Sequence, residues 1–257
     1  MGVSEFLLLD GTPLRTVDPA LLKATSFGHF SSLQVRDGRV DGLDLHYDRL
    51  DKSTRDVFRT PLPADRVRTE LRAALEHAGA GDLSLRVQVF ADTEVHLLTR
   101  VGPPIAPGTE PLRLLAVEHE RAVPHLKHSG TFDLIYYGRQ AQHAGYDDAL
   151  FHSTAGEISE ASIWNICFAR GARIVFPSAP VLPGIRQQLL QRGLESFDVE
   201  RVTDVSAYDA AYLTNSIDPA LPVASITVGA KTITYGKHPE SAERIAAAYA
   251  TESAQPI

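Results

Sequence analysis

The order of apolar and polar residues predicts a hairpin and two helices in the first part of the chain. Residues 31–36 and 39–43 read as strands, and they flank Asp37-Gly38, a dipeptide that favours a tight turn between antiparallel strands. Residues 45–58 and 65–77 instead repeat apolar side chains every three or four positions, the spacing of amphipathic helices. We therefore expect a β-hairpin followed by two helices that bury one face each.

Later in the chain, short apolar runs bounded by glycine or proline predict strands, and longer periodic segments predict helices. The expected strands cover residues 83–90, 94–101, 112–120, 148–152, 162–169, 173–176, 210–214 and 224–228. The expected helices cover residues 131–143, 184–192 and 241–250. This mixture favours an α+β fold over a doubly wound parallel sheet. We expect a smaller N-terminal domain of residues 1–120 and a larger C-terminal domain of residues 121–257.

The composition excludes several classes of function. A net charge of −7 argues against a nucleic-acid surface, which is built from clustered Lys and Arg. No run approaches the roughly 20 apolar residues of a membrane helix. The single cysteine, Cys167, has no internal disulfide partner, so a reducing, cytoplasmic setting is expected. The sequence suggests no metal site, and small molecules remain as the expected partners.

Two residues with complementary chemistry stand 33 positions apart (160 − 127), Lys127 and Glu160. Lysine amines form Schiff bases with carbonyl cofactors, and pyridoxal 5′-phosphate (PLP) needs an acidic partner for its ring nitrogen. Lys127 is therefore the candidate catalytic residue, moving a proton between the substrate α-carbon and the cofactor carbon as base and then acid. The alternative is a solvated lysine and an exposed acid, and Glu157 lies close enough in sequence to compete with Glu160.

A third feature could bind the cofactor's phosphate. Leu182-Pro183-Gly184 precedes an expected helix, and the first N–H groups of a helix attract anions. The backbone N–H groups of Ile185 and Arg186 are thus candidate phosphate donors. Together, Lys127, Glu160 and the start of this helix predict a PLP site.

These residues lie in an order that resembles the class IV aminotransferase family. That family has a lysine opening a helix, a Gly-x-Asp-Asp-Ala-Leu strand, a Gly-x-x-x-Glu-x-x-x-x-Asn run and a Leu-Pro-Gly before a helix. Here the order reads Lys127, residues 145–150, residues 156–165 and Leu182-Pro183-Gly184. Four motifs in register are more specific than any one of them.

The resemblance implies a two-domain PLP enzyme of fold type IV, similar to D-amino-acid aminotransferase, with the cofactor between the domains. It also implies a homodimer. Arg49 lies in a stretch similar to the family's His-x-x-Arg-Leu helix, whose arginine grips the phosphate. Asn215 and Ser216 occupy the place of a phosphate-binding Thr/Ser pair. Arg186 departs from the family, which usually has Thr or Ser there.

The resemblance implies transfer of an amino group between an amino acid and a 2-oxo acid through a lysine Schiff base. Lys127-His128 is instead similar to the lyase branch, so elimination of pyruvate from aminodeoxychorismate to give 4-aminobenzoate is the alternative. Phe132 stands where branched-chain enzymes have a tyrosine. A third possibility is a non-catalytic small-molecule binder that kept the fold. The amino donor, the acceptor and the stereochemistry are not specified by these residues.

Overall fold

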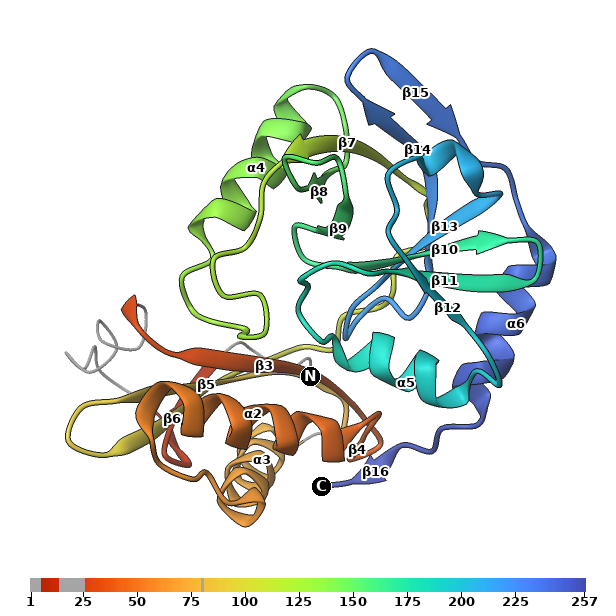
Figure 1. Cartoon of the computed structure of the whole chain (residues 1–257). Coiled ribbons are helices and arrows are strands. Elements are labelled where there is room, and N and C mark those ends of the chain that lie inside the picture. The colour runs from red at the N-terminus through yellow and green to blue at the C-terminus, as the bar shows by residue number, and fades with distance from the viewer. Residues whose placement is uncertain (1–5, 14–25, 80) are drawn as a thin grey trace. The chain divides into compact units, whose positions relative to one another are not determined.

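The computed structural model describes residues 6–13, 26–79 and 81–257, which form two compact units (Figure 1). Unit 1 comprises Met1–Ala106, Leu126–Gly130 and Ser253–Ile257, and unit 2 comprises Pro107–His125 and Thr131–Glu252. The expected domains of residues 1–120 and 121–257 stay a prediction. The strand that starts at Leu112 pairs with strands of unit 2.

Unit 1 is a seven-stranded sheet covered by two helices, with strand order β16-β4-β3-β5-β6-β1-β2. Its strands are β1 (Phe6–Leu9), β2 (Thr12–Pro13), β3 (His29–Arg36), β4 (Arg39–Val40), β5 (Leu83–Ala91), β6 (Val95–Gly102) and β16 (Gln255–Pro256). Its helices are α2 (Leu43–Phe58) and α3 (Ala64–Ala78). Every pairing in this sheet is antiparallel.

The expected hairpin and both expected helices are present. Asp37 and Gly38 have φ of 50° and 67°, the left-handed values that a tight hairpin turn requires. Gly79 ends α3 in the left-handed conformation with φ of 60°, which costs glycine little because it has no Cβ. The local sequence thus determines where these elements start and stop.

The core of unit 1 lies between the sheet and its two helices. Alternate residues of β3 and β5 point to this side and are buried, as the two-residue period of a strand requires. Leu50 of α2 and Leu71 of α3 pack into the same cluster. The opposite face of β3 and β5 carries Phe30, Arg86 and Gln88. Because this face points away from the core between sheet and helices, polar side chains are tolerated on it.

Unit 2 contains a nine-stranded sheet that closes on itself. The order is β12-β11-β10-β13-β14-β7-β8-β9, β15 pairs with β14, and β9 also pairs with β10. The strands are β7 (Leu112–Glu118), β8 (Asp148–His152), β9 (Ile158–Ala161), β10 (Asn165–Arg170), β11 (Arg173–Pro177), β12 (Asp198–Glu200), β13 (Ala210–Thr214), β14 (Leu221–Val228) and β15 (Lys231–Thr234). The β9–β10 pairing joins β10, β13, β14, β7, β8 and β9 into a ring.

Three helices pack around this ring: α4 (Phe132–His143), α5 (Ile185–Gly193) and α6 (Pro239–Ala250). Helix α4 packs against β8, and α5 and α6 lie side by side next to β10, β11 and β13 (Figure 1). The α5–α6 approach is close: a Cβ on Gly193 would lie 2.1 Å from the carbonyl oxygen of Ala248. No helix in the described residues is long and apolar enough to cross a membrane.

Two predictions about local structure were wrong. The expected strand of residues 162–169 begins only at Asn165, as β10, because residues 162–164 form a turn, and β9 before that turn was not expected. Lys127 does not open a helix, since α4 begins at Phe132, close to the start of the expected helix of residues 131–143. The turn at residues 162–164 contains neither proline nor glycine, so the sequence pattern does not mark it.

Candidate active site

Lys127 lies in a short segment that extends the edge of the unit 1 sheet. Phe30 donates its N–H to the carbonyl of Lys127 at 2.8 Å, and Ser129 donates to the carbonyl of Gly28 at 2.8 Å. His128 forms an antiparallel bridge with His29. The lysine is therefore held by main-chain bonds to β3, and its backbone position does not depend on a helix.

Gly28 allows the backbone just before β3 to lie close to β5. A Cβ at position 28 would lie 2.3 Å from the carbonyl oxygen of Val89. That separation is far below contact distance, so any side chain would push the backbones apart. Glycine is required here by lack of space, because its φ lies outside the left-handed region.

Two cations share the ring of Phe30. The Nζ of Lys127 lies 5.0 Å from the ring centroid, and the guanidinium carbon of Arg86 lies 3.5 Å from it. Burial, and then the charge of Arg100, lowers the pKa of Arg86 to about 10. Its Nε is buried with no hydrogen-bond partner, and the described residues offer it no carboxylate. Arg86 is thus a desolvated cation suited to an anionic ligand.

Arg49 is largely buried on α2, and its guanidinium contacts β3. Its Nη2 donates to Ser31 Oγ at 2.5 Å, while its Nε has no acceptor among the described residues. Burial lowers the pKa of Arg49 to about 10. A buried guanidinium without an acidic partner is costly, and a bound phosphate would neutralise it.

His29, beside Arg49, adds no charge near neutral pH. Burial, and then the charge of Arg49, lowers the pKa of His29 to about 4. Its Nε2 lies 3.0 Å from Thr54 Oγ1, and His46 Nδ1 lies 2.6 Å from Ser31 Oγ. Because Ser31 Oγ accepts a hydrogen bond from Arg49, the hydroxyl proton of Ser31 is available to His46. This series of hydrogen bonds fixes the guanidinium in place.

In unit 2, Glu160 is a buried carboxylate with several partners. Its Oε1 lies 3.5 Å from Arg121 Nε, and both side chains are almost completely buried. The same oxygen accepts from the N–H of Leu182 at 3.3 Å, and Oε2 accepts from Asn165 Nδ2 at 3.4 Å. These partners fix the buried carboxylate in one position.

Asn165 links this carboxylate to the start of α5. Its Nδ2 also donates to the carbonyl of Leu182 at 2.8 Å. Gly184, the residue before α5, lies so close that a Cβ there would be 1.9 Å from Asn165 Oδ1. Asn165 therefore has a structural role, since it joins β10 to the Leu182-Pro183-Gly184 turn.

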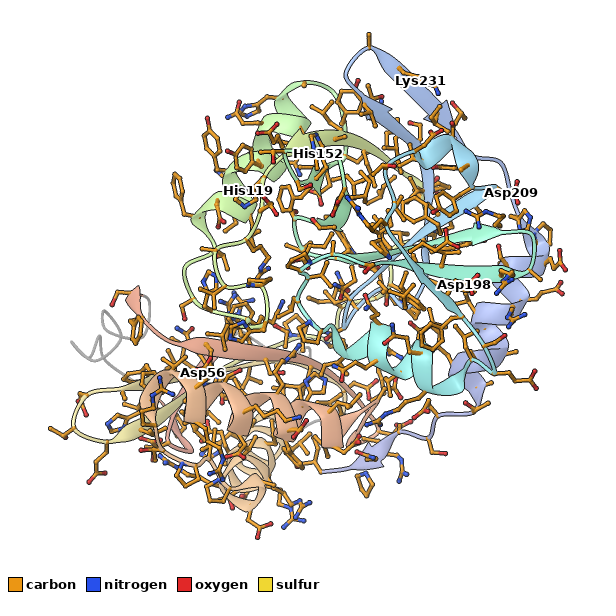
Figure 2. All side chains as sticks on the ribbon, viewed as in Figure 1. Asp56, His119, His152, Asp198, Asp209 and Lys231 are labelled. Atoms are coloured by element: carbon orange, nitrogen blue, oxygen red, sulfur yellow. The ribbon has the colours of Figure 1, made fainter. Side chains whose placement is uncertain are left out.

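The segment before Arg121 is fixed to α4 and β8. His119 donates its N–H to the carbonyl of His152 at 3.0 Å (Figure 2). Its ring packs against Tyr137, and its Nε2 lies 2.9 Å from Asp133 Oδ2. Arg121 thus follows a firmly held strand end, which favours a constant position of its guanidinium.

The candidate phosphate residues of unit 2 lie at a helix start and at a turn. Ile185 and Arg186 occupy the first turn of α5, whose N–H groups lack acceptors within the helix. Asn215 uses its Oδ1 to accept from the N–H groups of Ile217 and Asp218, at 2.7 and 2.8 Å. Its side chain therefore shapes the turn, and Ser216 lies at that turn, partly exposed.

The structure thus divides the predicted residues between the units. Lys127 and Arg49 belong to unit 1, and Glu160 with the α5 start and the 214–218 turn belongs to unit 2. Sequence reasoning missed Arg86 and Arg121, because an arginine in a strand or loop has no distinctive pattern. Arg86 alternates in phase with Ser84 and Gln88 on the polar side of a half-buried strand, so the pattern gave no signal for it. Cys167 is buried, as expected of a core residue, and burial raises its pKa to about 12.

Comparison with known proteins identifies the family of this chain. The model of amino-transferase class IV matches residues 28–226. The chain belongs to the class IV aminotransferase family. The resemblance inferred from the motifs is confirmed, and the family consists of enzymes that use PLP. No curated protein matches the sequence significantly.

Solved structures of class IV enzymes share the fold at low identity. Branched-chain amino acid aminotransferase from Escherichia coli has a TM-score of 0.78 at 17% identity, covering 95% of this chain and 92% of its own. A hypothetical aminotransferase from Mycobacterium tuberculosis, in a PLP-bound form, has 0.77 at 20%, covering 96% and 99%. A protein provisionally assigned as 4-amino-4-deoxychorismate lyase from Legionella pneumophila has 0.77 at 22%, covering 91% and 94%. The expected α+β, fold type IV class is confirmed.

Proposed function

We propose that this class IV enzyme transfers an amino group between an amino acid and a 2-oxo acid, with PLP as cofactor. The observation that carries the proposal is the setting of Glu160. It is a buried carboxylate beside Arg121, tied by its own oxygens to the turn before α5. A protein that only binds small molecules has no need for a buried acid fixed in this way.

The residues of both units fit the chemistry of PLP. Arg49 supplies a buried positive charge whose Nε has no acceptor, and the first N–H groups of α5, at Ile185 and Arg186, supply backbone donors. Asn215 and Ser216 would complete the phosphate contacts from their turn. Glu160 would hold the ring nitrogen, and Lys127 would carry the cofactor covalently.

When bound, PLP supplies an electron sink for a carbanion at the substrate α-carbon. Glu160 would pair with the protonated ring nitrogen, because its carboxylate is fixed in place beside Arg121. The Nζ of Lys127 would accept the proton from the substrate α-carbon. It would then donate a proton to the cofactor carbon. Phe30 packs beside this amine and limits access of water to it.

Arg86 is a candidate receptor for the carboxylate of the amino acid or 2-oxo acid. It lies on the same phenyl ring as the Lys127 amine, and no acid in the described residues neutralises it. A guanidinium binds a carboxylate through two parallel hydrogen bonds. This pairing would explain why a cation is kept at a desolvated position.

The second candidate function is the lyase reaction, elimination of pyruvate to give 4-aminobenzoate. One sequence observation favours it, since Lys127-His128 is similar to the lyase branch. The two reactions would use the same lysine and glutamate. They differ in which bond breaks after the substrate proton has left, and the substrate decides between them.

A donor–acceptor screen tests the proposal. The purified protein with PLP is given L- and D-amino acids with 2-oxo acids, and in a separate arm aminodeoxychorismate. We expect amino transfer in the wild type and in Lys52→Ala, and none in Lys127→Ala, because Lys52 is an exposed lysine paired with Asp48. Release of 4-aminobenzoate without amino transfer would assign the lyase function. No turnover with any substrate would favour a non-catalytic binder.

A homodimer and a cytoplasmic setting were also expected, and both stay predictions. We propose the homodimer as the working assembly of this enzyme. Light scattering on the purified protein measures it: a mass near twice the 28.0 kDa of the chain supports the dimer, and a mass near 28 kDa contradicts it.

A further inference from the structure

The hydroxyl of Tyr249 connects the two backbone segments of unit 2 that the proposed function assigns to phosphate. It lies 3.0 Å from the carbonyl of Arg186 in the first turn of α5. It also lies 2.9 Å from the carbonyl of Pro219 and 3.2 Å from Thr214 Oγ1. Thr214 and Pro219 flank the turn that contains Asn215 and Ser216. One side chain from α6 therefore reaches both segments.

A tyrosine hydroxyl has one proton and can also accept. The two carbonyls compete for that proton, and the Thr214 hydroxyl can donate in return. Replacing Tyr249 by phenylalanine would therefore remove the shared donor and acceptor at once, while leaving the ring in place. Arg186 and the 214–219 turn would then be held less firmly relative to each other.

The contacts around α5 form a closed circuit. Asn165 holds the Leu182 carbonyl on one side of the helix start, and in the sheet Asn165 pairs with Thr214. Thr214 contacts Tyr249, and Tyr249 contacts Arg186. Without the tyrosine hydroxyl, the helix start would lose this hydrogen bond to α6.

The side chain of Arg186 supports the same reading. Its guanidinium carbon lies 5.6 Å from the centre of the Tyr249 ring, so the arginine folds back onto α6. Arg186 stands where the family usually has a hydroxyl residue. With the side chain held by Tyr249, position 186 offers a phosphate its backbone N–H, and the direction of that N–H depends on the helix start.

We propose that Tyr249 is a positioning residue for the cofactor's phosphate. Its hydroxyl holds the α5 start and the 214–219 turn in the arrangement that binds the phosphate group. The inference rests on the proposed function, since it assumes that these two segments are the phosphate donors. It adds that α6, which carries none of the predicted site residues, determines how well they bind.

The test compares PLP with pyridoxal, which has the same ring and aldehyde but no phosphate. Dissociation constants of both are measured by absorbance for the wild type, Tyr249→Phe and Tyr212→Phe. Tyr212 is the matched control, because its buried hydroxyl also joins β13 to α6, through His238 and Ser241. We expect Tyr249→Phe to bind PLP roughly 3- to 10-fold more weakly, the loss of about one hydrogen bond, with pyridoxal binding unchanged. Tyr212→Phe should keep the wild-type ratio of the two constants.

Each other result overturns a defined part of the account. An equal loss of PLP and pyridoxal in Tyr249→Phe would show a purely structural role for this tyrosine. A wild-type ratio in that variant would show that the hydroxyl does not act on the phosphate. If the wild type itself binds PLP no tighter than pyridoxal, the phosphate site of the proposed function is wrong, and this inference falls with it.

Discussion

Glu160 and Arg121 show how burial assigns a role to a single residue. Two charges removed from water are stable together only when their geometry and hydrogen bonds compensate for lost solvation. Here the pair is completed by the N–H of Leu182 and the amide of Asn165. Glu157, the competing acid in the sequence, is instead paired with the exposed Arg201. The structure therefore favours Glu160 as the acid of the site.

The first prediction concerns Glu160→Gln. Gln keeps the size of the side chain but cannot carry the negative charge that would hold a protonated ring nitrogen. We expect PLP to stay bound while kcat falls by at least about tenfold and KM changes little, because the lost interaction strengthens in the transition state. Steady-state kinetics measures this, with Glu157→Gln as the control. A wild-type kcat in Glu160→Gln would assign the role to another acid.

The second prediction concerns Arg49→Ala. A charge-assisted bond contributes roughly 1.5–3 kcal/mol, so removing the guanidinium should weaken PLP binding by about 10- to 100-fold. Excess PLP should restore much of the activity, since Lys127 and Glu160 remain. Arg55→Ala on the same helix, which loses only an exposed pair with Asp51, should bind PLP normally. Equal PLP affinities in the wild type and Arg49→Ala, by titration, would contradict the phosphate role.

At the scale of elements, turns explain most differences between the expected and observed structure. Strong local signals, such as Asp37-Gly38 and Gly79, placed the hairpin and the helix end correctly. β9 was missed because its four residues form no apolar run and the turn before β10 contains neither proline nor glycine. The short strands β1 and β16 were missed because their partners lie far away in the sequence, and β2 is a two-residue strand paired with β1.

The third prediction concerns the turn before α5. Gly184→Ala places a Cβ 1.9 Å from Asn165 Oδ1, so either the turn or the amide must move. We expect a loss of roughly 1–3 kcal/mol in stability, typical of overpacking, together with weaker PLP binding. Gly236→Ala is the control, because its Cβ would meet no atom within 4 Å. Chemical denaturation and PLP titration are the measurements; a Gly184→Ala protein that matches the control in both would contradict this packing.

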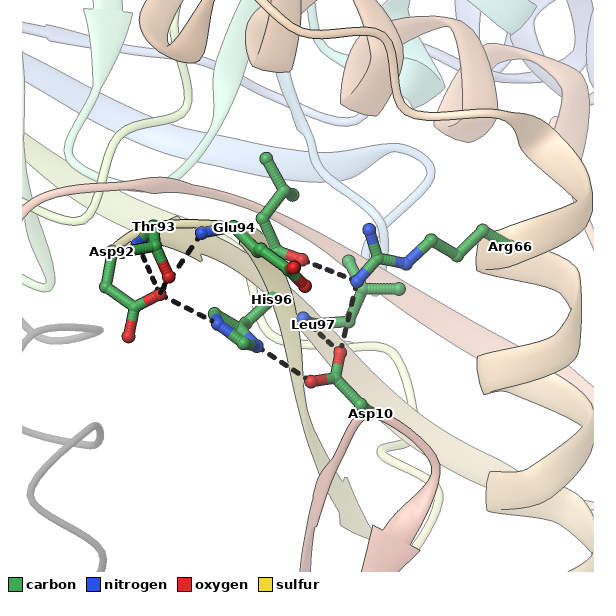
Figure 3. Close-up of polar contacts among 8 residues, drawn as sticks. Asp10, Arg66, Asp92, Thr93, Glu94, His96 and Leu97 are labelled. Carbon is green, nitrogen blue, oxygen red and sulfur yellow. Dashed lines mark hydrogen bonds and ion pairs between the residues drawn. The ribbon is translucent and has the colours of Figure 1, made fainter.

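A polar cluster joins the β1–β2 turn to β6 in unit 1 (Figure 3). His96 lies between two carboxylates, 2.9 Å from Asp10 Oδ2 and 3.1 Å from Asp92 Oδ1. Arg66 contacts Asp10 Oδ1 at 3.4 Å, and the N–H of Leu97 donates to the same oxygen. The hydrogen bond to Asp10 raises the pKa of His96. Burial opposes the change, but the bonds from Leu97 and His96 lower the pKa of Asp10.

The fourth prediction is a pH dependence of this cluster. The raised pKa of His96 means that its stabilisation is complete below its ordinary value of 6.5 and is lost as pH rises through the folded value. The lowered pKa of Asp10 adds stability above 3.8 that is lost as pH falls. His96→Gln should therefore lower Tm by roughly 1–4 °C at pH 5.5 and by less at pH 8.5. His77→Gln, at an exposed site on α3, is the control. A Tm difference independent of pH would contradict this assignment.

At the scale of the whole molecule, the sequence predicts the family and most element types, and the candidate site residues stay predictions. Motifs in register suffice for this, because each motif is a short run of neighbouring residues. The ring of strands in unit 2 was not predictable, since its β10–β13 and β14–β7 pairings join strands far apart in the sequence. Arg86 and Arg121 were not predictable either, because burial alone distinguishes them from other arginines.

The central claim is that Lys127 carries PLP, and one measurement tests it directly. The protein is incubated with PLP and reduced with borohydride, and its peptides are mapped by mass spectrometry. The account predicts a pyridoxyl group on Lys127, and none after Lys127→Ala. A label on Lys52, Lys231 or Lys237 in place of Lys127, or no label at all, would contradict it.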